Sequence, residues 1–596
     1  RAWDQSGATA GQQGTKVDAS TNGGTTAFST ASETAAIMVT AVNDAPVLDS
    51  GGTPTLTTIS EDDAASAGDT VAAILASAGG DRITDVDAGA LEGIAVTGLS
   101  SGNGTWQYSI DGGSTWQAVG AVSDASALLL RDTDRLRFVP DGLNADSASI
   151  TLRAWDQSGA TAGQHGTKVD ASINGGSTPF STVAETAAIT VTAINDTPTI
   201  TNGATVTLAS TDEDTSSSTT TVATILSGAS WADVDAGALL GLAVTSRTGN
   251  GTWQYSSDGV TWTAFGAVSA SNALLLDATT QVRYVPDGQN AEAASFGFVA
   301  WDRSSGAAST NGSPSMADPG AGGGTSAFSS EIAGATLSVT AVNDAPVLDT
   351  GGNMLLTTIS EDQTATSGNT VGSILASAGG DRITDIDAGA LEGIAVTGLA
   401  SGNGTWQYSI DGGSTWQAVG AVSDASALLL RDTDRLRFVP DGLNADTASV
   451  SFRAWDQSGA TSGQQGTKVD ASINGGTSAF SAASETAAIS VAALNDAPVL
   501  DTSGTPTLTT ITEDDAASAG DTVAAILASA GGDRITDIDA GAIEGIAVTG
   551  LSSGNGSWQY SIDGGSTWQA VGAVSDANAL LLRDTDRLRF VPDGLN

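Results

Sequence analysis

The sequence contains the stretch Ala-Val-Asn-Asp-Ala-Pro-Val at 41–47, and close variants return at 193–199, 341–347 and 493–499. The step is about 150 residues, close to the common length of a whole domain and longer than a solenoid unit. Proline fixes its own φ and favours extended backbone before it, as a joint between domains requires. We predict repeats at 43–194, 195–342 (diverged) and 343–494, the C-terminal part of a truncated repeat at 1–42 and the N-terminal part of one at 495–596.

Each repeat shows the alternation of half-buried strands. In repeat one, Trp106, Tyr108 and Ile110 alternate with polar residues, and Ile150, Leu152 and Ala154 do the same. Short strands separated by turn signals are typical of an antiparallel β-sandwich, so we predict an all-β array of such domains with no convincing amphipathic helix. The loop over 157–184 is long enough to be functional or disordered. Trp155 has the opposite parity to its strand, and we expect it at the domain end.

The composition excludes several classes of protein. There are 67 acidic residues and 21 basic ones, a formal net charge of −46. A nucleic-acid binder or a protein held on an anionic membrane by charge needs a basic surface. No run is long enough to span a membrane, and both ends fall inside a repeat, so we expect a piece of a longer polypeptide. With no cysteine, an extracellular chain needs a stiffener other than disulfides, and metal is the first candidate.

Acidic residues recur at fixed points of every repeat: the Asn-Asp joint, a Glu-Asp pair after the first strand, Asp-x-Asp-Ala-Gly, and Trp-Asp. Calcium binds about six to eight oxygen ligands, several of them carboxylates. The alternative is that these residues cap turns and keep the protein soluble. Diverged repeat two keeps Glu213, Asp233, Asp235 and Asp302, which favours metal.

The order Ser60-Glu61, Asp85-Val86-Asp87-Ala88-Gly89, Trp155-Asp156 and Asn195-Asp196-Thr197-Pro198 resembles the calcium motifs of the cadherin fold. The closer resemblance is to bacterial cadherin-like, Ig-like repeats of giant surface adhesins and RTX-type secreted proteins. The sequence departs from the animal pattern, because Ala193 replaces the first linker Asp and the proline comes one residue sooner. This departure predicts fewer or weaker ions.

The resemblance implies which residues bind calcium. Between repeats one and two, the ion would use Glu61, Asp85, Asp87 and Asp156 with Asn195 and Asp196, and repeat two would supply matching ligands. The full predicted metal set is Asn43, Asp44, Glu61, Asp85, Asp87, Asp156, Asn195, Asp196, Glu213, Asp233, Asp235, Asp302, Asn343, Asp344, Glu361, Asp385, Asp387, Asp456, Asn495, Asp496, Glu513, Asp537 and Asp539.

Two further motifs lie in one predicted hairpin. Residues 109–116, Ser-Ile-Asp-Gly-Gly-Ser-Thr-Trp, resemble the Asp-box of sialidases, a hairpin device without catalytic residues. Trp106 and Trp116 could form a sugar-stacking platform, although cross-strand packing is the simpler interpretation. The single histidine, His165, is replaced by Gln465 in repeat three, so we predict no enzyme and no catalytic residues.

These observations predict an extracellular stalk on a bacterial cell surface, which calcium stiffens at the joints for adhesion and biofilm formation. Its partners would be neighbouring repeats, and surface glycans or other cells, without nucleic acid or membrane insertion. An array of carbohydrate-binding modules is the alternative, and a sialidase-like glycoside hydrolase is a remote one.

Overall fold

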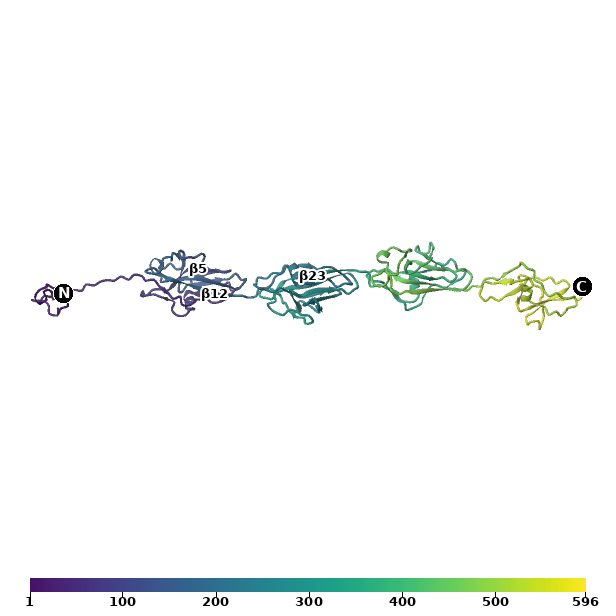
Figure 1. The fold of residues 1–596 in the computed structure, drawn as a ribbon, viewed down its shortest axis with the longest axis horizontal. Helices are drawn as coiled ribbons and strands as arrows, with labels where there is room; N and C mark the ends of the chain where they lie inside the picture. The colour runs from purple at the N-terminus through teal and green to yellow at the C-terminus, as the bar shows by residue number, and fades with distance from the viewer. Residues whose placement is uncertain (596) are drawn as a thin grey trace.

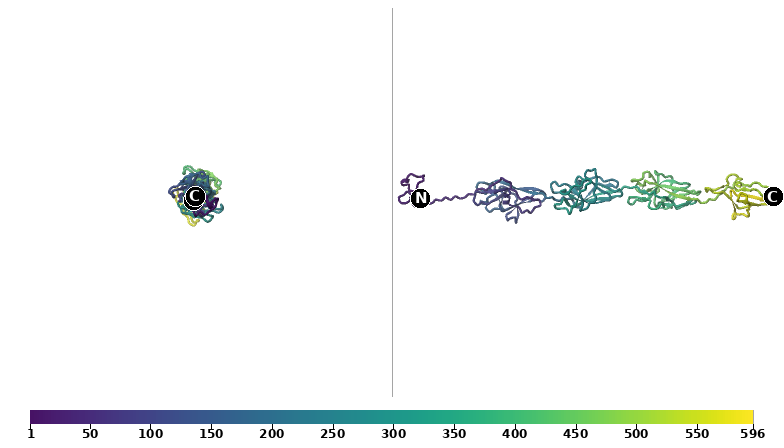
Figure 2. Two further views of the ribbon diagram at one scale, coloured as in Figure 1. Left: turned by 90° about the vertical axis from the view of Figure 1, so that its left-hand side faces the viewer. Right: turned by 90° about the horizontal axis from the view of Figure 1, so that it is seen from below.

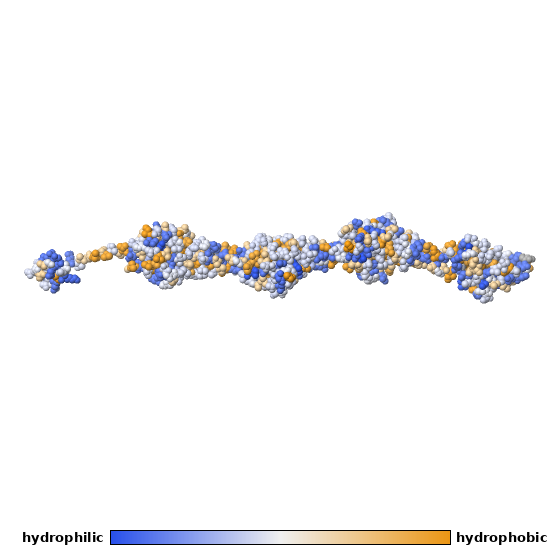
Figure 3. Space-filling view, viewed as in Figure 1, coloured by the Kyte–Doolittle hydropathy of each residue, from blue (hydrophilic) through white to orange (hydrophobic). Residues whose placement is uncertain are grey.

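The computed structural model describes residues 1–595 and shows separate bodies placed end to end along one axis (Figure 1). The bodies overlap in the view along that axis (Figure 2). Residues 1–42 form a small piece with one turn of 3₁₀ helix, η1 (Gly7–Thr9), and an extended segment. This segment exposes Ile37, Met38 and Val39 and is the apolar connection near the N-terminus in Figure 3.

Repeat one contains the elements that the other repeats vary. They are β1 (Val47–Leu48), β2 (Ile59–Ser60), β3 (Asp69–Thr70), α1 (Val71–Ala76), β4 (Ile83–Thr84), β5 (Gly93–Ser100), β6 (Thr105–Ser109), β7 (Gln117–Ala118), β8 (Ala127–Arg131), β9 (Arg135–Val139), β10 (Asp146–Trp155), η2 (Gly159–Thr161), β11 (Lys168–Val169) and β12 (Phe180–Thr192).

Two main sheets form a sandwich in repeat one. The larger has the order β11-β8-β5-β10-β12-β2 and the smaller has the order β3-β9-β6-β7, while β1 pairs with β4. Alternating side chains of both sheets fill one core that includes Ile150, Leu152, Trp106 and Phe138. The predicted all-β sandwich is therefore confirmed, with one addition. Strand β2 runs parallel to β12, with Ile59 opposite Val191 and Ser60 opposite Thr192.

Repeat two follows the same plan with β13 (Thr205–Thr207), β14 (Thr211–Asp212), β15 (Thr220–Thr221), α2 (Val222–Gly228), β16 (Gly241–Thr248), β17 (Thr252–Ser256), β18 (Thr263–Ala264), β19 (Ala273–Asp277), β20 (Gln281–Val285), β21 (Glu292–Trp301), β22 (Met316–Ala317) and β23 (Phe328–Thr340). Its sheets are β13-β23-β21-β16-β19-β22, with β14 added beside β23, and β15-β20-β17-β18.

Repeat three contains β24 (Val347–Leu348), β25 (Met354–Leu355), β26 (Ile359–Ser360), β27 (Asn369–Thr370), α3 (Val371–Ala376), β28 (Ile383–Thr384), β29 (Gly393–Ala400), β30 (Thr405–Ser409), β31 (Gln417–Ala418), β32 (Ala427–Arg431), β33 (Arg435–Val439), β34 (Asp446–Trp455), η3 (Gly459–Thr461), β35 (Lys468–Val469) and β36 (Glu485–Ala492).

The last body contains β37 (Val499–Leu500), β38 (Asp521–Thr522), α4 (Val523–Ala528), β39 (Ile535–Thr536), β40 (Gly545–Val548), β41 (Gly556–Ser561), β42 (Gln569–Ala570), β43 (Leu580–Arg583) and β44 (Arg587–Pro592). It has the four-stranded sheet β38-β44-β41-β42 and two separate strand pairs. The repeat boundaries assigned from the sequence stay predictions.

A short helix in each body corrects the expectation of a chain without amphipathic helices. Thr70 caps α1, because its hydroxyl oxygen accepts the backbone N–H of Ala73 at 3.1 Å. Val71, Ile74 and Leu75 are buried at helical spacing. The helix is too short for its period to stand out from an apolar strand, and only the threonine cap before it gave a signal.

The long loop of repeat one covers the outer face of the larger sheet. Trp155 points to that face and packs with Leu129 and with Ala171 and Phe180 of the loop and the strand after it, in a second core. The indole N–H of Trp155 donates to the Thr161 hydroxyl at 2.7 Å. The odd parity of Trp155 thus reflects burial of the outer face of the sheet at the end where β10 finishes.

A prediction about stability follows for Trp155. Trp155→Ala should lower the free energy of unfolding of repeat one by about 3–5 kcal/mol, because it empties the second core. In scanning calorimetry, the unfolding transition of repeat one should occur at a lower temperature than in the parent chain.

Trp3→Ala is the matched control, since Trp3 has the same motif and donates to Thr9 at 2.9 Å but has no large sheet beneath it. Equal thermograms for the two variants would contradict the second core.

Candidate metal centres at the joints

Glu61 lies at the C-terminal end of repeat one, beside the linker that leaves it. Its Oε1 accepts the backbone N–H of Ile194 at 2.5 Å, and its own N–H donates to the carbonyl of Thr192 at 3.0 Å. The parallel pairing of β2 with β12 causes this placement, because both strands end at the same edge. Glu61 is only 1% exposed.

The N-terminal end of repeat two holds the other side of the same joint. The backbone N–H of Asp196 donates to Asp235 Oδ2 at 2.8 Å, and Asn195 Nδ2 donates to Asp302 Oδ2 at 2.9 Å. Asp235 donates its own N–H to Asp233 Oδ1 at 2.9 Å, which closes a tight turn. The linker is thereby fastened to the repeat that follows it.

One carboxylate from each side and one from the linker converge. In each group, one oxygen of every residue lies within 4.8 Å of the others. The joint clusters are Glu61 with Asp196 and Asp235, Glu213 with Asp344 and Asp387, and Glu361 with Asp496 and Asp539. These groups of carboxylates could hold a metal ion.

Several carboxylate oxygens at the joints are buried without a hydrogen-bond partner. Within residues 1–595 they include the second oxygens of Glu61, Asp196 and Asp233. All three positions recur at the next joint as Glu213, Asp344 and Asp385, and two of them recur at the last joint as Glu361 and Asp496. None of the ion pairs among the described residues involves a member of the joint clusters. A buried, unpaired carboxylate is costly unless a cation or a proton balances it.

The electrostatics of the joint disfavour ionisation. Burial, followed by the charges of Asp235 and Asp62, raises the pKa of the Asp196 carboxyl above its ordinary value. Asp344 shows the same direction, with burial as the main cause and then Asp387 and Asp214. Burial is also the main cause that raises the pKa of the Asp233 carboxyl, although a hydrogen bond from the backbone of Asp235 acts in the opposite direction. Like charges gathered in a partly dry site produce this direction.

The grouping of ligands that the resemblance implied needs one correction. Asp87 accepts the N–H of Asp44 at 2.8 Å and Asp156 accepts Asn43 Nδ2 at 2.9 Å, so both lie at the joint before repeat one. Glu61 lies at the joint after it. One repeat therefore offers its Glu to one joint and its aspartates to the other, because they follow strands that end at opposite ends of the sandwich.

The structure brings most predicted residues to the joints. Asn343 donates to Asp456 at 2.9 Å, and Asp496 donates its N–H to Asp539, which follows Asp537 in the same turn. Asn495 donates to the carbonyl of Asp496 at 2.7 Å. Glu513 is exposed in the last body, with no cluster around it among the described residues. Whether these residues bind metal stays a prediction.

Sequence reasoning missed two kinds of residue at the joints. Asp62, Asp214 and Asp362 raise the pKa of the linker aspartates; the sequence placed them in the recurring Glu-Asp pair but left them out of the predicted metal set. Asn144 contacts the next repeat, and only the turn Pro140-Asp141-Gly142 before it was visible as a signal.

The Asp-box folds as a hairpin device. Asp111 accepts the N–H and hydroxyl of Thr115 at 2.8 and 2.6 Å and the hydroxyl of Ser109 at 2.7 Å. Trp106 is 2% exposed in the core, so a platform made of both tryptophans is wrong. Trp116 is half-buried, and the Arg137 guanidinium lies 4.1 Å from its ring centre. Each tryptophan therefore packs against β9, Trp106 against Phe138 and Trp116 against Arg137.

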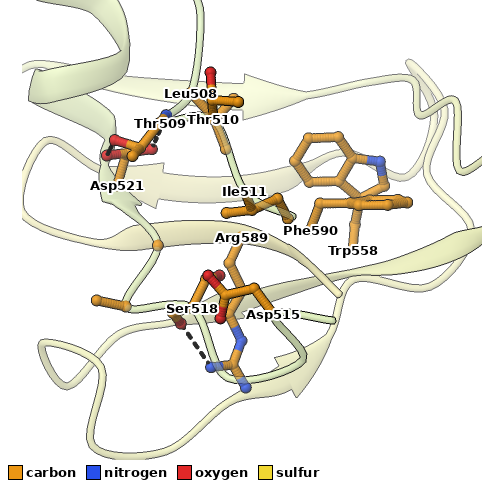
Figure 4. Close-up of a pocket in the computed structure, with 12 residues that line it drawn as sticks. Leu508, Thr509, Thr510, Ile511, Asp515, Ser518, Asp521, Trp558, Arg589 and Phe590 are labelled. Atoms are coloured by element: carbon orange, nitrogen blue, oxygen red, sulfur yellow. Dashed lines mark hydrogen bonds between the residues drawn. The ribbon is translucent and has the colours of Figure 1, made fainter. Parts of the chain in front are cut away.

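A pocket in the last body belongs to its core. Leu508, Ile511, Trp558 and Phe590 line a cavity of about 390 Å³ (Figure 4). In repeat one, the counterpart Leu56 donates its backbone N–H to the Ala188 carbonyl of β12, and the counterpart Ile59 pairs with Val191 of the same strand. Residues 495–596 contain no counterpart of that strand, so we assign the cavity to an open core rather than to a ligand.

No protein-family model and no curated protein matches this chain. Similar solved structures include protocadherin gamma B7 extracellular cadherin domains 1–4, with 12% identity, TM-score 0.31 and coverage of 84% of this chain and 91% of that one. Mouse cadherin-23 EC22-24 has 11% identity and a TM-score of 0.32, with coverage of 76% of this chain and 100% of that one. The human desmocollin-1 ectodomain has 10% identity and a TM-score of 0.25, with coverage of 92% of this chain and 79% of that one. Among the described residues, no helix has the length and apolarity to cross a membrane. Because these comparisons establish no family, the proposed function rests on the geometry of the joints.

A pH dependence follows from the Asp-box. Hydrogen bonds from Thr567 first, then Ser561, lower the pKa of Asp563 from 3.8 to about 2, and Thr115 lowers that of Asp111. A lowered pKa stabilises the fold above the ordinary value, and this stability is lost as the pH falls through the folded value. The Asp-box recurs at 409–416 and 561–568 and, shortened, at 256–262. These four motifs should therefore weaken between about pH 4 and pH 2.

The test compares the chain with a variant carrying Asp111→Asn, Asp258→Asn, Asp411→Asn and Asp563→Asn. The difference between their melting temperatures should be largest at pH 5 and should shrink steadily as the pH falls from about 4 to about 2. A difference that stays constant with pH would contradict the assignment.

Proposed function

We propose that this chain is part of an extracellular stalk in which calcium ions at the joints stiffen tandem β-sandwich repeats. The observation that carries the proposal is the convergence of three carboxylates, contributed by two repeats and their linker, with buried oxygens that have no partner within residues 1–595. A cation there would connect both bodies at once.

The donor set fits calcium better than a transition metal. The candidate ligands are carboxylate and amide oxygens, without cysteine anywhere in the chain and with the single histidine in a loop. Calcium prefers oxygen ligands and tolerates irregular geometry, whereas thiolate and imidazole donors favour zinc or copper. At the first joint, Glu61, Asn195, Asp196, Asp233, Asp235 and Asp302 would hold the ion.

Adhesion on a bacterial surface is the biological role that we propose. The array is extended (Figure 1), strongly acidic and free of cysteine, which suits a spacer that stands away from a cell. Cells, surfaces or glycans would be bound elsewhere in a longer protein. The buried Trp106 gives no support to a carbohydrate-binding array.

Removal of calcium tests the mechanism. In chelator, repulsion among the joint carboxylates should let the repeats bend, so small-angle scattering should give a smaller maximum dimension and linkers should be cleaved faster by protease. Readdition of calcium should restore the extended profile. Scattering curves that overlay with and without chelator would exclude stiffening by calcium.

Loss of one ligand per joint tests the site. The variant Glu61→Gln, Glu213→Gln, Glu361→Gln should bind calcium at least about tenfold more weakly in a calorimetric titration, because each substitution removes one carboxylate of a cluster.

The matched control is Asp170→Asn, Asp318→Asn, Asp470→Asn, which removes the same charge at exposed loop positions of the same repeats. Equal weakening in both variants would mean that net charge, rather than the clusters, binds calcium.

A further inference from the structure

A second kind of contact crosses the joints beside the carboxylates. Asn144 of repeat one accepts the backbone N–H of Ala236 in repeat two through its Oδ1 at 3.1 Å. At the next joint, Asn290 Oδ1 accepts the N–H of Ala388 at 3.1 Å, and its Nδ2 donates to the carbonyl of Ile386 at 3.3 Å. The contact thus recurs between repeats that have diverged in sequence.

The asparagine is held in place by a tight loop after the strand before it. In repeat one, Leu143 donates its N–H to Asp141 Oδ1 at 3.2 Å, and Gly142 has φ +77°, which glycine adopts without strain. A Cβ on Gly142 would lie 3.9 Å from the Glu61 carbonyl, and one on Gly288 would lie 3.9 Å from that of Glu213. The loop therefore lies against the backbone of the joint glutamate.

The receiving turn is built by the aspartates themselves. The backbone N–H of Asp235 donates to Asp233 Oδ1, and the backbone N–H of Ala238 donates to the Asp235 carbonyl. The N–H of Ala236 is left to bond with the preceding repeat. The turn that presents Asp235 to the carboxylate cluster thus also receives Asn144.

We infer that the Pro-Asp-Gly-x-Asn loop is a metal-independent latch that docks on the Asp-x-Asp-Ala-Gly turn of the next repeat. The latch sets the rotation of one repeat relative to the next. Its partners are an amide side chain and backbone groups, which are uncharged, so chelation leaves them intact. Each repeat carries the loop at one end and the turn at the other, and such a head-to-tail contact extends without closing. At the third joint, Asn444 and Ala540 occupy the same sequence positions, although the structure forms no hydrogen bond between these two described residues.

The latch would also fix the relative orientation of two repeats at a joint that holds no ion. Repulsion among carboxylates pushes the bodies apart but does not select an orientation, whereas a hydrogen bond between a fixed loop and a fixed turn does. Loss of one such bond should lower the ratio of latched to open joints about 2- to 10-fold. The inference needs no bound ion and therefore stands or falls separately from the proposed function.

The test uses the whole chain, which has no cysteine of its own. Cysteines introduced at exposed Ala125 and Ser271 carry a donor and an acceptor dye, one in each of repeats one and two. Single-molecule energy transfer is recorded for the parent, for Asn144→Ala, and for Leu143→Ala, which changes the exposed neighbour in the same loop. Each is measured in chelator and in calcium.

In chelator, the parent and Leu143→Ala should divide between a latched population of defined transfer efficiency and a broad open one, and Asn144→Ala should lower the ratio of latched to open joints about 2- to 10-fold. Identical distributions for Asn144→Ala and the parent in chelator would overturn the latch. A broad distribution for the parent in chelator would overturn it too, while leaving calcium stiffening possible. A parent distribution that calcium leaves unchanged would count against the proposed function and not against the latch.

Discussion

Buried carboxylates at the joints are the constraint on which the array depends. Each joint gathers like charges from two repeats and a linker, with oxygens that receive no hydrogen bond within the described residues. Such oxygens cannot all stay ionised in a partly dry site without an opposing charge. The orientation of neighbouring repeats therefore depends on what neutralises the cluster, and under our proposal a divalent cation would do so while binding both repeats.

The sandwich fold makes this coupling geometrically possible. Because β2 runs parallel to β12, Glu61 emerges beside the strand that leads into the linker, and its Oε1 holds the first linker residues. The turns with Asp233 and Asp235 precede β16 and lie at the opposite end of their own repeat. Rigid strands thus carry one part of a site to each end of every body, and stacking the bodies completes it.

One end of the larger sheet is buried on both faces. Trp155 and Phe180 lie on its outer face under the loop that the sequence left open as functional or disordered. That loop contributes packing, and it places Asp156, the residue after Trp155, against Asn43 of the preceding joint. The second core and the joint are therefore connected by one peptide unit.

Much of the fold could be predicted because its signals are local. Alternation in Trp106 to Ile110 and the turn at 111–114 mark a hairpin, and the recurring Asn-Asp-x-Pro stretch marks the joints. The short helices were missed because six residues beginning at Val71 fit a strand as well as a helix. Residue type and recurrence marked the acidic points, and the family resemblance implied the set of candidate ligands. Neither indicated Asn144, because an asparagine after a turn has no pattern of its own.

The sequence by itself determined the number and spacing of the joints, the acidic character of the chain and the oxygen-rich residues of each repeat. Only the tertiary structure decided that Glu61 meets Asp196 and Asp235, while Asp87 and Asp156 meet the joint before them. The physical reason is that a cluster between two bodies depends on which end of a sandwich each strand reaches. Strand direction and pairing are set by contacts between distant segments, and these contacts have no local signature in the chain.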